Sequence, residues 1–378
     1  MQRLAVDPRP DWRERAEELG FAFHTIDGQP YWCEDAAYCF SAAQIDELDD
    51  AAQRLEEMSL DLVEDVVRRG AYEPFRLSDT ACAMIEESWR RQDKNLYGRF
   101  DFAWAGSGPP KLLEYNADTP TALYESSVVQ WEWLDSYCAH CDQFNGIHEM
   151  LIEAWKNFGL WGHRVHFTCV RDHAEDIGTV DYLRDTALQA GLETGRIFVD
   201  EIGWNGKRFV DLVAKPITVL FKLYPWEWLL QEGFAGHIGP SGVRMIEPAW
   251  KMLLSTKALL PLLWDRFPDH ENLLPASFEA DAIRGARVSK PFWGREGAGI
   301  TRLAADGSIA EAVPGQAEIA EAADAMVWQQ AVEMPCFDGF YPVLGVWMIA
   351  SRACGLGIRE DNSPITRNSS RFVPHLFE

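Results

Sequence analysis

The chain has 378 residues, of which 47% are hydrophobic and 25% are charged, as in a folded globular protein. Its formal charge of −24 argues against a nucleic-acid partner, because such a field repels a polyanion. No apolar run approaches the about 20 residues of a membrane span, and the first residues lack the apolar core of a signal peptide. We therefore expect a cytoplasmic protein with neither nucleic acid nor membrane as partner.

The N-terminal part of the chain is mainly helical in pattern. Ser41 is a suitable N-cap, apolar residues recur at helical spacing from there to Arg69, and Gly70 then ends the helix. A second helix follows a cap at Ser78 or Asp79. Ahead of them we expect a short helix and two strand-like segments, at residues 12–19, 21–25 and 30–33.

Two segments at residues 97–104 and 111–116 alternate polar and apolar residues, and a turn-rich connection joins them. Pairing these strands gathers four polar side chains on one sheet face: Arg99, Asp101, Glu114 and Asn116. Two carboxylates and an amide oxygen suit Mg²⁺, and a nearby arginine suits a phosphate. The spacing alone equally allows a solvated polar face of an antiparallel sheet.

Alternating strands and helices are predicted in the middle of the chain. Residues 123–150 have a helical pattern, and residues 225–230 and 250–267 are further helices, the last with Lys257 near its start. Between them we expect a strand at 164–170, a helix to residue 190, and strands at 196–200, 208–212 and 217–222. This βαβ pattern indicates a small α/β substrate subdomain at about residues 160–225.

The eight cysteines are scattered, and only Cys138 and Cys141 lie close together. In a cytosolic protein we expect reduced thiols. With His148 nearby, these two cysteines could form half of a zinc site. The absence of a second Cys/His pair at zinc-site spacing and the helical pattern of residues 128–152 argue against it.

A glycine-rich reversal follows a predicted strand at residues 287–292. Its glycines, at residues 294–299, would let backbone N–H groups approach phosphate oxygens, although an ordinary turn explains them as well. It is not a Walker A loop, because no Gly-Lys-Ser/Thr follows. Residues 325–333 form a short apolar strand that suits either an adenine site or the core, and residues 342–350 form a long buried strand.

Taken together, these motifs resemble the synthetase domain of the glutathionylspermidine synthase family, in a stand-alone form without the amidase domain of bifunctional members. The most specific piece is Leu-Glu-Tyr-Asn-Ala-Asp-Thr-Pro-Thr at residues 113–121, and Lys257, Lys290 and Gly-Ile-Arg359 follow in the family's order. The resemblance implies an α+β protein with an ATP-grasp-like fold in permuted order and the additional α/β subdomain, residues 1–378 forming one functional unit.

The resemblance also implies roles for individual residues. Asp101, Glu114 and Asn116 correspond to Mg²⁺ ligands, and Arg99 and Arg359 to arginines at the transferred phosphoryl group. Arg99 and a further set correspond to ATP contacts: Lys257, Lys290, Gly297, Ala298, Gln329, Gln330, Ala331, Val332, Pro364, Ile365 and Thr366. Thr119 and Thr121 correspond to the acid-substrate site, and Glu175 and Asp176 to the amine-substrate site.

We therefore predict an ATP- and Mg²⁺-dependent ligase that joins a carboxylic acid to an amine through an acyl phosphate. The expected partners are a peptide or thiol-peptide acid such as glutathione and a polyamine such as spermidine. Two other readings are a non-catalytic nucleotide-binding or regulatory protein on the same scaffold, and a zinc-dependent hydrolase that uses Cys138, Cys141 and His148.

Overall fold

The computed structural model describes residues 1–26, 28–315 and 325–378. Within them, helices and sheets are mixed, as the sequence predicts. The α-helices are α1 (Trp12–Glu18), α2 (Ala42–Arg69), α3 (Asp79–Arg90), α4 (Gln130–Tyr137), α5 (Ile147–Asn157), α6 (Ala174–Gln189), α7 (Trp226–Leu229), α8 (Ile238–Ser241) and α9 (Leu259–Arg266).

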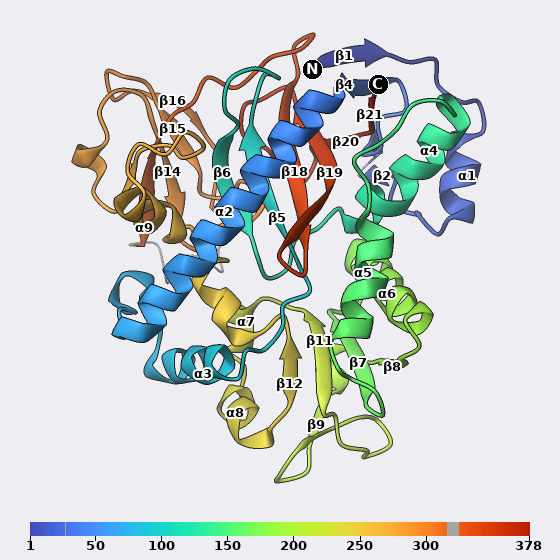
Figure 1. Cartoon of the computed structure of the whole chain (residues 1–378), viewed down its shortest axis with the longest axis vertical. Coiled ribbons are helices and arrows are strands. Elements are labelled where there is room, and N and C mark those ends of the chain that lie inside the picture. Colours follow the sequence, from blue (N-terminus) through green and yellow to red (C-terminus); the bar gives the residue numbers. More distant parts are fainter. Residues whose placement is uncertain (27, 316–324) are drawn as a thin grey trace.

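Two five-stranded antiparallel sheets form the upper part of the molecule (Figure 1). The first, here called the central sheet, has the order β20 (Arg371–Val373), β19 (Arg352–Asp361), β18 (Tyr341–Ile349), β5 (Tyr97–Ala103) and β6 (Lys111–Asn116). The second, here called the lateral sheet, has the order β13 (Ala276–Ser277), β17 (Met326–Gln330), β14 (Arg287–Pro291), β15 (Thr301–Leu303) and β16 (Ile309–Ala312).

A four-stranded parallel sheet forms the lower part (Figure 1). Its order is β12 (Arg244–Ile246), β11 (Val219–Leu223), β7 (Arg164–Cys169) and β8 (Glu193–Arg196). The smaller sheets are β1 (Gln2–Ala5), β4 (Ala36–Phe40) and β21 (His375–Phe377), then β2 (Thr25–Ile26) with β3 (Gln29–Pro30), and β9 (Gly203–Trp204) with β10 (Phe209–Val210).

The long helix α2 packs across the central sheet (Figure 1) and has the predicted bounds. Ser41 and Gln44 form a reciprocal capping box at its start, and Gly70 ends it in the left-handed region at φ 65°. Leu48, Ala52 and Leu55 on its inner face are fully buried in the main hydrophobic core. The helix therefore supports the sheet that carries the polar hairpin.

The predicted hairpin is confirmed as strands β5 and β6. Its register places Asp101 opposite Glu114 and Arg99 opposite Asn116. On the other face, the rings of Phe100 and Tyr115 stack with centroids 3.7 Å apart and lie in the core shared with α2. Burial of the aromatic face leaves the polar side chains together on the opposite face.

A buried ion pair joins the segment after the hairpin to the parallel sheet. Lys222 Nζ lies 2.6 Å from Asp118 Oδ1, and each side chain is about 1% exposed. The second carboxylate oxygen of Asp118 accepts the backbone N–H of Trp226 at 2.9 Å. Burial lowers the pKa of Lys222, with Asp118 opposing that shift. The pair therefore fixes the parallel sheet against the hairpin.

The predicted strands at residues 196–200 and 208–212 are wrong in extent. The first ends at Arg196, because the Glu201 carboxylate accepts the N–H of Phe198 and turns the chain into a short 3₁₀ helix, Val199–Glu201. The second is only Phe209–Val210, because Asp211 accepts two later backbone N–H groups, those of Val213 and Lys215. Local side-chain hydrogen bonds have replaced strand pairing at both points.

The predicted continuous helix over residues 123–150 is also wrong. A π-helical turn at Glu125–Val129 leads into α4, and α5 starts only at Ile147. The chain between them pairs elsewhere, since Asp142 bridges to Phe377 and the N–H of Gly146 donates to the carbonyl of Cys354 at 2.7 Å. These long-range pairings compete with helix continuation.

The predicted helix over residues 250–267 is divided as well. A 3₁₀ helix at Ala249–Leu253 precedes α9, and Lys257 lies in the turn between them. The N–H of Lys257 donates to the carbonyl of Phe292 at 3.0 Å, which ties this turn to the end of β14. Near the N-terminus, the two expected strand-like segments are reduced to the short pair β2 and β3.

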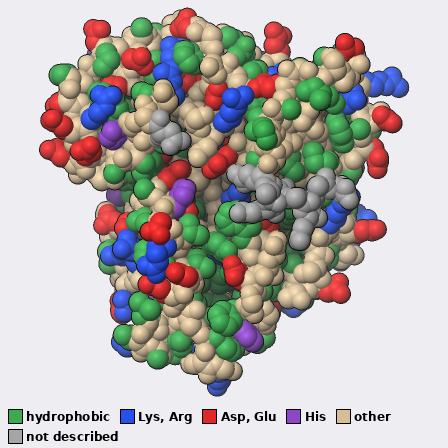
Figure 2. Space-filling model, turned by 180° about the vertical axis from the view of Figure 1, so that it is seen from behind, with side chains coloured by type: hydrophobic (Ala, Val, Ile, Leu, Met, Phe, Trp, Pro, Cys, Tyr) green, Lys and Arg blue, Asp and Glu red, His purple; other side chains and the backbone are tan. Residues whose placement is uncertain are grey.

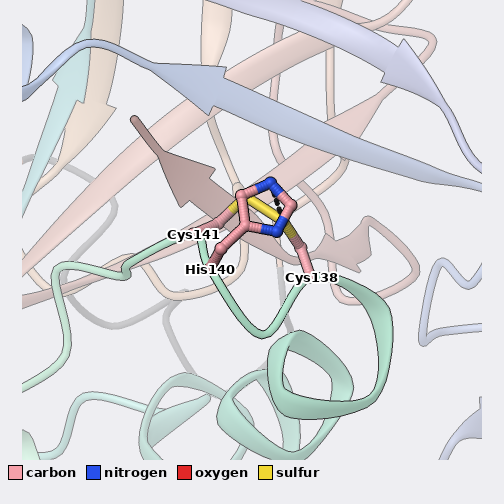
Figure 3. Close-up of side chains that lie close together, drawn as sticks. All are labelled: Cys138, His140 and Cys141. Carbon is pink, nitrogen blue, oxygen red and sulfur yellow. Dashed lines mark hydrogen bonds between the residues drawn. A yellow bond between two sulfur atoms is a disulfide. The ribbon is translucent and has the colours of Figure 1, made fainter.

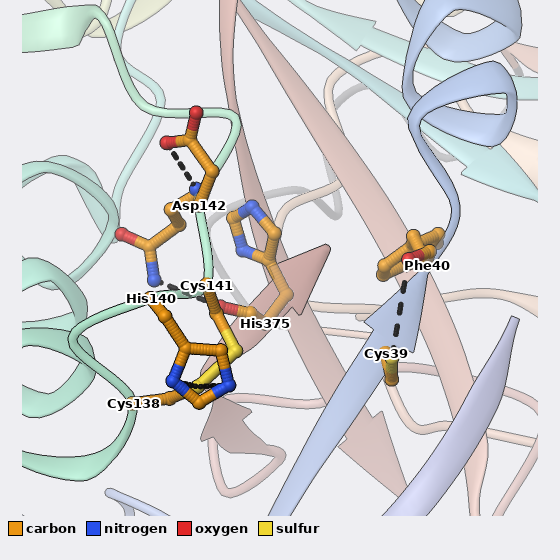
Figure 4. Close-up of a disulfide and its surroundings, with 8 residues drawn as sticks. Cys39, Phe40, Cys138, His140, Cys141, Asp142 and His375 are labelled. Carbon is orange, nitrogen blue, oxygen red and sulfur yellow. Dashed lines mark hydrogen bonds between the residues drawn. A yellow bond between two sulfur atoms is a disulfide. The ribbon is translucent and has the colours of Figure 1, made fainter. Parts of the chain in front are cut away.

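Cys138 and Cys141 form a disulfide at the end of α4, so the prediction of reduced thiols at these positions is wrong (Figure 3). Their Cα atoms are 5.4 Å apart, within the range that a disulfide spans. The ring of His140 lies against Cys138 Sγ, and His375 lies nearby in the same view (Figure 4). His148 instead contacts Tyr182 Oη at 3.2 Å, so it does not complete the suggested zinc site.

None of the helices in the described ranges combines the length and the apolar character that a membrane crossing requires. Viewed from behind, the molecule is hollowed between its upper and lower parts, with hydrophobic side chains in the depression and charged side chains beside it (Figure 2).

The glycine at position 357 is expected to be required for packing of the π-helical turn on the central sheet. A Cβ there would collide with Ser126 Oγ and approach Phe372 to 3.2 Å. Gly357→Ala should therefore lower the free energy of unfolding by about 1–3 kcal/mol, measured by urea denaturation. Gly236→Ala, whose added Cβ meets no atom within 4 Å, is the control and should change it by less than about 0.5 kcal/mol.

Candidate active site

An open pocket lies between the polar face of the hairpin and the lateral sheet. Most of the predicted site residues line it: Arg99, Asp101, Glu114, Asn116, Thr119, Thr121, Lys290, Gly297, Gln329, Gln330, Val332, Arg359, Pro364, Ile365 and Thr366. The others, Lys257, Ala298, Ala331, Glu175 and Asp176, lie outside its lining.

The hairpin brings two carboxylates and an amide into direct contact. Asn116 Nδ2 donates to Asp101 Oδ2 at 2.9 Å and to Glu114 Oε1 at 3.2 Å. Arg99 donates to both oxygens of Asp101, at 2.6 and 2.8 Å, and to the carbonyl of Thr121 at 2.6 Å. Burial raises the pKa of Asp101, and Arg99 opposes that shift. The carboxylate oxygens of Asp101 and Glu114 and the amide oxygen of Asn116, which are possible metal ligands, are thus concentrated in one part of the pocket.

Two lysines from distant segments compensate the charge of Glu114. Lys257 Nζ lies 3.1 Å from Glu114 Oε2 and also donates to the carbonyl of Gly294 at 2.6 Å. Burial acts to raise the pKa of Glu114, but Lys257 and Lys290 oppose burial and lower it to about 2. Glu114 is therefore ionised at neutral pH. Burial lowers the pKa of Lys290 to about 8, with Glu114 opposing.

Lys290 also links the two antiparallel sheets. Its Nζ donates to the carbonyl of Leu113 on β6 at 2.7 Å and to Gln329 Oε1 on β17 at 2.8 Å. Gln329 Nε2 in turn donates to the carbonyl of Leu112 at 3.0 Å. The predicted nucleotide contact Gln329 thus orients Lys290 in this structure, and its side chain joins the lateral sheet to the hairpin.

The predicted adenine strand contributes unequally to the pocket. Gln330 and Val332 line it, whereas the N–H of Ala331 donates to the carbonyl of Ala286 at 3.0 Å and is occupied in the sheet. The walls here also include apolar side chains that sequence analysis missed: Leu274, Val288, Ile300, Met334 and Val343. Only Val288 and Val343 lie in predicted strands, where alternation could have indicated them; the other three lie outside those strands.

The glycine-rich turn packs directly on residues 364–366, which are among the predicted ATP contacts. Gly297 has φ 73°, and a Cβ there would collide with the carbonyl oxygen of Thr366. Ala298 is 5% exposed and its N–H donates to the carbonyl of Arg295 at 2.8 Å, so it stabilises the turn from behind the pocket. Glycine at position 297 is therefore required by both conformation and space.

Arg359 lies on β19 at the side of the pocket opposite the lateral sheet. Its guanidinium group donates to the carbonyls of Arg367, Asn368 and Ser370 at 2.7, 2.9 and 3.2 Å. Burial raises the pKa of Asp101, and the positive charge of Arg359, like that of Arg99, opposes that rise. These carbonyl contacts hold a positive charge at a fixed point of the pocket wall.

Arg295 was not predicted as a site residue, although it lies in the glycine-rich turn. Its Nη1 donates to Thr119 Oγ1 at 2.6 Å, and its Nη2 lies 2.7 Å from Glu227 Oε1. It therefore connects the predicted acid-substrate residue Thr119 to α7. Its position next to Gly294 in the glycine-rich turn was a local signal, but its partners Thr119 and Glu227 come from two distant segments.

Glu175 and Asp176 lie in the first turn of α6. Burial raises the pKa of Glu175, with Arg359 opposing and Asp176 adding to the rise. The Asp176 N–H donates to His173 Nδ1 at 3.3 Å, and Asp176 raises the pKa of His173 through a side-chain hydrogen bond. The electrostatic interaction of Glu175 with Arg359 connects this acidic pair to one end of the pocket.

The family described as glutathionylspermidine synthase preATP-grasp matches residues 3–378. The chain belongs to this family. It is 43% identical to a Haemophilus influenzae protein provisionally named an acid–amine ligase, over the full length of both. It is 30% identical to trypanothione synthetase of Crithidia fasciculata over 79% of the chain, and 26% identical to the bifunctional glutathionylspermidine synthetase/amidase of Escherichia coli over 76%.

The chain spans about half the length of the latter two relatives, 50% of each. Among solved structures, a glutathione synthetase-like effector of Globodera pallida has the same fold, with a TM-score of 0.56 at 10% identity over 99% of the chain and 98% of the effector. The family and its acid–amine ligases confirm the predicted class of enzyme, an ATP-dependent ligase that forms C–N bonds.

The ion pairs around Glu114 should make stability depend on pH in acid. Its pKa is about 2 in the folded chain and 4.5 ordinarily, so the ionised carboxylate stabilises the fold above pH 4.5. That contribution is lost as the pH falls from about 4.5 towards 2. Chemical denaturation at pH 6 and pH 3 should show a larger loss for the wild type than for Glu114→Gln; equal losses would contradict the assignment.

Proposed function

We propose that the chain joins a carboxylic acid to an amine, with ATP cleaved to ADP and phosphate and with Mg²⁺ as the metal. The observation that carries the proposal is that the oxygen cluster of Asp101, Glu114 and Asn116 shares one pocket with Lys290, while Lys257 pairs with Glu114 from beside that pocket. Phosphoryl transfer depends on such charge neutralisation and alignment more than on a protein nucleophile.

The donor set fits Mg²⁺. Asp101 and Glu114 supply carboxylate oxygens, and Asn116 directs its amide N–H group at both of them, so its amide oxygen is the remaining acceptor. Mg²⁺ prefers oxygen ligands, and at phosphate-transfer sites it is usually held by one or two protein carboxylates together with the phosphates of the substrate. When bound, Mg²⁺ would offset phosphate charge during transfer.

The pocket walls support a placement of ATP. Lys257, Lys290 and Gly297 would contact the phosphates, and the apolar side chains of the lateral sheet, with Gln330 and Val332, would enclose the adenine. The proposed phosphate contacts and the adenine wall would thus both belong to the lateral sheet and its connections, with the metal-site residues on the hairpin opposite them, an arrangement that suits an ATP-grasp-like site. Here the metal-site residues precede the lysines in the chain, which is the permuted order.

The proposed reaction has two steps. The acid carboxylate attacks the γ-phosphorus of ATP and forms an acyl phosphate, with ADP as leaving group. The amine first gives up a proton to water or to a nearby carboxylate, and its neutral nitrogen then attacks the acyl carbon. Phosphate leaves and takes up the second proton of the nitrogen, which completes the amide. Arg99 and Arg359 would stabilise the charge of the transferred phosphoryl group, and Glu175 and Asp176 would bind the cationic amine.

The substrates that the relatives suggest are a thiol-peptide acid such as glutathione and a polyamine such as spermidine. Thr119 and Thr121, at the mouth of the hairpin, would hold the acid. The net charge of −24 favours a cationic co-substrate. We further propose that residues 1–378 act as one unit, with the α/β region at about residues 160–225 as its substrate subdomain.

A substrate screen tests the proposed function. Purified protein with ATP and Mg²⁺ should release ADP in the presence of a suitable acid and amine, and mass spectrometry should detect the amide. Pairs should include glutathione and γ-glutamylcysteine with spermidine and putrescine. ATP binding in calorimetry without any ADP or amide from any pair would favour a non-catalytic nucleotide-binding protein instead.

With a productive pair, Glu114→Gln should lower the rate of ADP formation more than about 100-fold, because a metal-site charge in a water-poor pocket supplies several kcal/mol. Glu57→Gln, at an exposed position of α2, is the control and should leave the rate unchanged. Retained Mg²⁺-dependent turnover in a folded Glu114→Gln protein would contradict the metal assignment.

Arg295→Lys should raise KM for the acid about tenfold and change KM for ATP less than about twofold. Lysine cannot contact Thr119 and Glu227 together as the planar guanidinium group does, and loss of one such contact corresponds to roughly 1.4 kcal/mol. Glu227→Gln should shift KM in the same direction. A rise in KM for ATP without a rise for the acid would assign Arg295 to the nucleotide instead, and equal rises would contradict a specific role at the acid site.

A further inference from the structure

Two cysteines and a histidine lie together in the tight turn that follows α4. Cys138, His140 and Cys141 each offer one ligand atom, and these three atoms lie within 4.8 Å of one another (Figure 3). None of the three side chains lines the pocket between the hairpin and the lateral sheet. The cluster has no role in the ligase steps described above, so it calls for an explanation of its own.

The distances and donor types within the cluster fit a tetrahedral metal ion. Cys138 Sγ lies 3.5 Å from Nε2 and 3.6 Å from Nδ1 of His140. Ordinary Zn–S and Zn–N bonds in a tetrahedral site place a sulfur and a nitrogen ligand about 3.6 Å apart. The two cysteines are three residues apart, a spacing that zinc sites use for a pair of thiolates. Thiolate and imidazole donors suit Zn²⁺ rather than Mg²⁺, which prefers oxygen ligands.

Backbone hydrogen bonds hold this turn in place independently of the disulfide. The N–H of Cys138 donates to the carbonyl of Leu134 at 2.8 Å, and the N–H of Cys141 donates to the carbonyl of Cys138 at 3.0 Å. Directly after the turn, Asp142 pairs with Phe377 of β21 through two backbone hydrogen bonds, at 3.1 and 2.9 Å. We therefore expect both cysteines to keep their places between α4 and β21 when the bond between their sulfur atoms is broken.

The cluster is open to solvent on the side of its histidine. His140 is exposed, Cys141 is half-buried and Cys138 is 9% exposed. His375 lies nearby (Figure 4), but its Nδ1 lies 2.9 Å from Gln130 Oε1 and its Nε2 accepts a backbone N–H at 3.1 Å. Because both nitrogens of His375 are engaged, a metal ion in the cluster would take water as its fourth ligand.

The disulfide and a bound metal ion exclude each other, because a metal ion needs the two sulfur atoms as separate thiolates. A dithiol, or two molecules of a small thiol, opens the disulfide: the S–S bond breaks, each cysteine gains one hydrogen atom, and the reductant is oxidised to a disulfide. Binding of the cation displaces the two thiol protons, which pass to water. Exchange with a small disulfide re-forms the S–S bond and releases the cation, and the small disulfide is reduced to two thiols.

We propose that the reduced turn binds one divalent cation of the Zn²⁺ type through Cys138, His140 and Cys141, and that oxidation of the two cysteines releases it. The inference goes beyond the proposed ligase and does not depend on it, because none of the three ligands lines the active-site pocket. The cluster is thereby a metal site whose occupancy follows the thiol–disulfide state of its surroundings.

A titration with Co²⁺, a coloured replacement for Zn²⁺, tests the site on the full chain. The protein is reduced with dithiothreitol, freed of the reductant without oxygen, and kept in excess Mg²⁺ so that oxygen-ligand sites are occupied. About one equivalent of Co²⁺ should then give thiolate-to-metal charge-transfer absorption and the visible bands of tetrahedral coordination. Zn²⁺ should remove both signals by displacing Co²⁺, and the oxidised chain should show neither.

His140→Ala should weaken the binding of Zn²⁺ to the reduced chain at least about tenfold, measured by competition with a chromophoric chelator. Loss of an outer partner of a metal ligand already costs roughly 10–100-fold in affinity, so loss of a ligand itself should cost no less. His148→Ala is the matched control, because His148 contacts Tyr182 and Gln189 instead, and it should keep the wild-type affinity.

A second pair of variants tests the thiolates. Cys138→Ser should remove at least about half of the charge-transfer absorption, because one of the two thiolate ligands is lost. Cys336→Ser, at an exposed free cysteine, is its control and should leave that absorption unchanged.

Three outcomes would overturn the inference while leaving the proposed ligase intact. The first is a reduced wild type that shows no charge-transfer absorption with Co²⁺, or that binds Zn²⁺ no better than the oxidised chain. The second is wild-type affinity in His140→Ala, because the cysteines would then bind the metal without the histidine. The third is a disulfide that dithiothreitol does not open while the chain stays folded, as followed by thiol counting and circular dichroism.

Discussion

Antiparallel pairing of β5 with β6 forces Asp101 and Glu114 to face each other on one surface of the sheet. Two neighbouring carboxylates out of water are tolerated only when positive charges and hydrogen bonds compensate them. Arg99 and Asn116, on the same two strands, supply part of this compensation, and Lys257 and Lys290 supply the rest. Much of the surrounding fold serves to bring those lysines to the hairpin.

The compensating groups also connect the sheets. Lys290 bonds to both the hairpin and β17, Lys257 sits in a turn fastened to the end of β14, and Arg295 spans from Thr119 to α7. The charges that suit phosphate chemistry are therefore also contacts that hold the pocket walls together. The same side chains would bind the ligand and connect the sheets, which explains why the pocket residues make so many hydrogen bonds.

The hairpin could be predicted from sequence because period-2 alternation and a turn-rich connection are local signals. Helix α2 was predictable for the same reason, since its capping box and terminal Gly70 lie within its own segment. Lys257, Lys290 and Arg359 were placed by family resemblance alone, because nothing local ties them to Glu114. The break after α4 and the Thr119–Arg295–Glu227 contact were missed because they depend on pairing between remote segments.

The buried pair of Asp118 and Lys222 has a consequence for how ligands enter. Pulling the parallel sheet away from the hairpin would leave two unpaired charges in apolar surroundings, at about 3–5 kcal/mol. We therefore expect the parallel sheet to keep its position relative to the hairpin. We therefore expect an opening that admits nucleotide to come from the lateral sheet, whose side-chain contacts with the hairpin run through Lys290 and Gln329. Both side chains can exchange these carbonyl partners for water or a ligand.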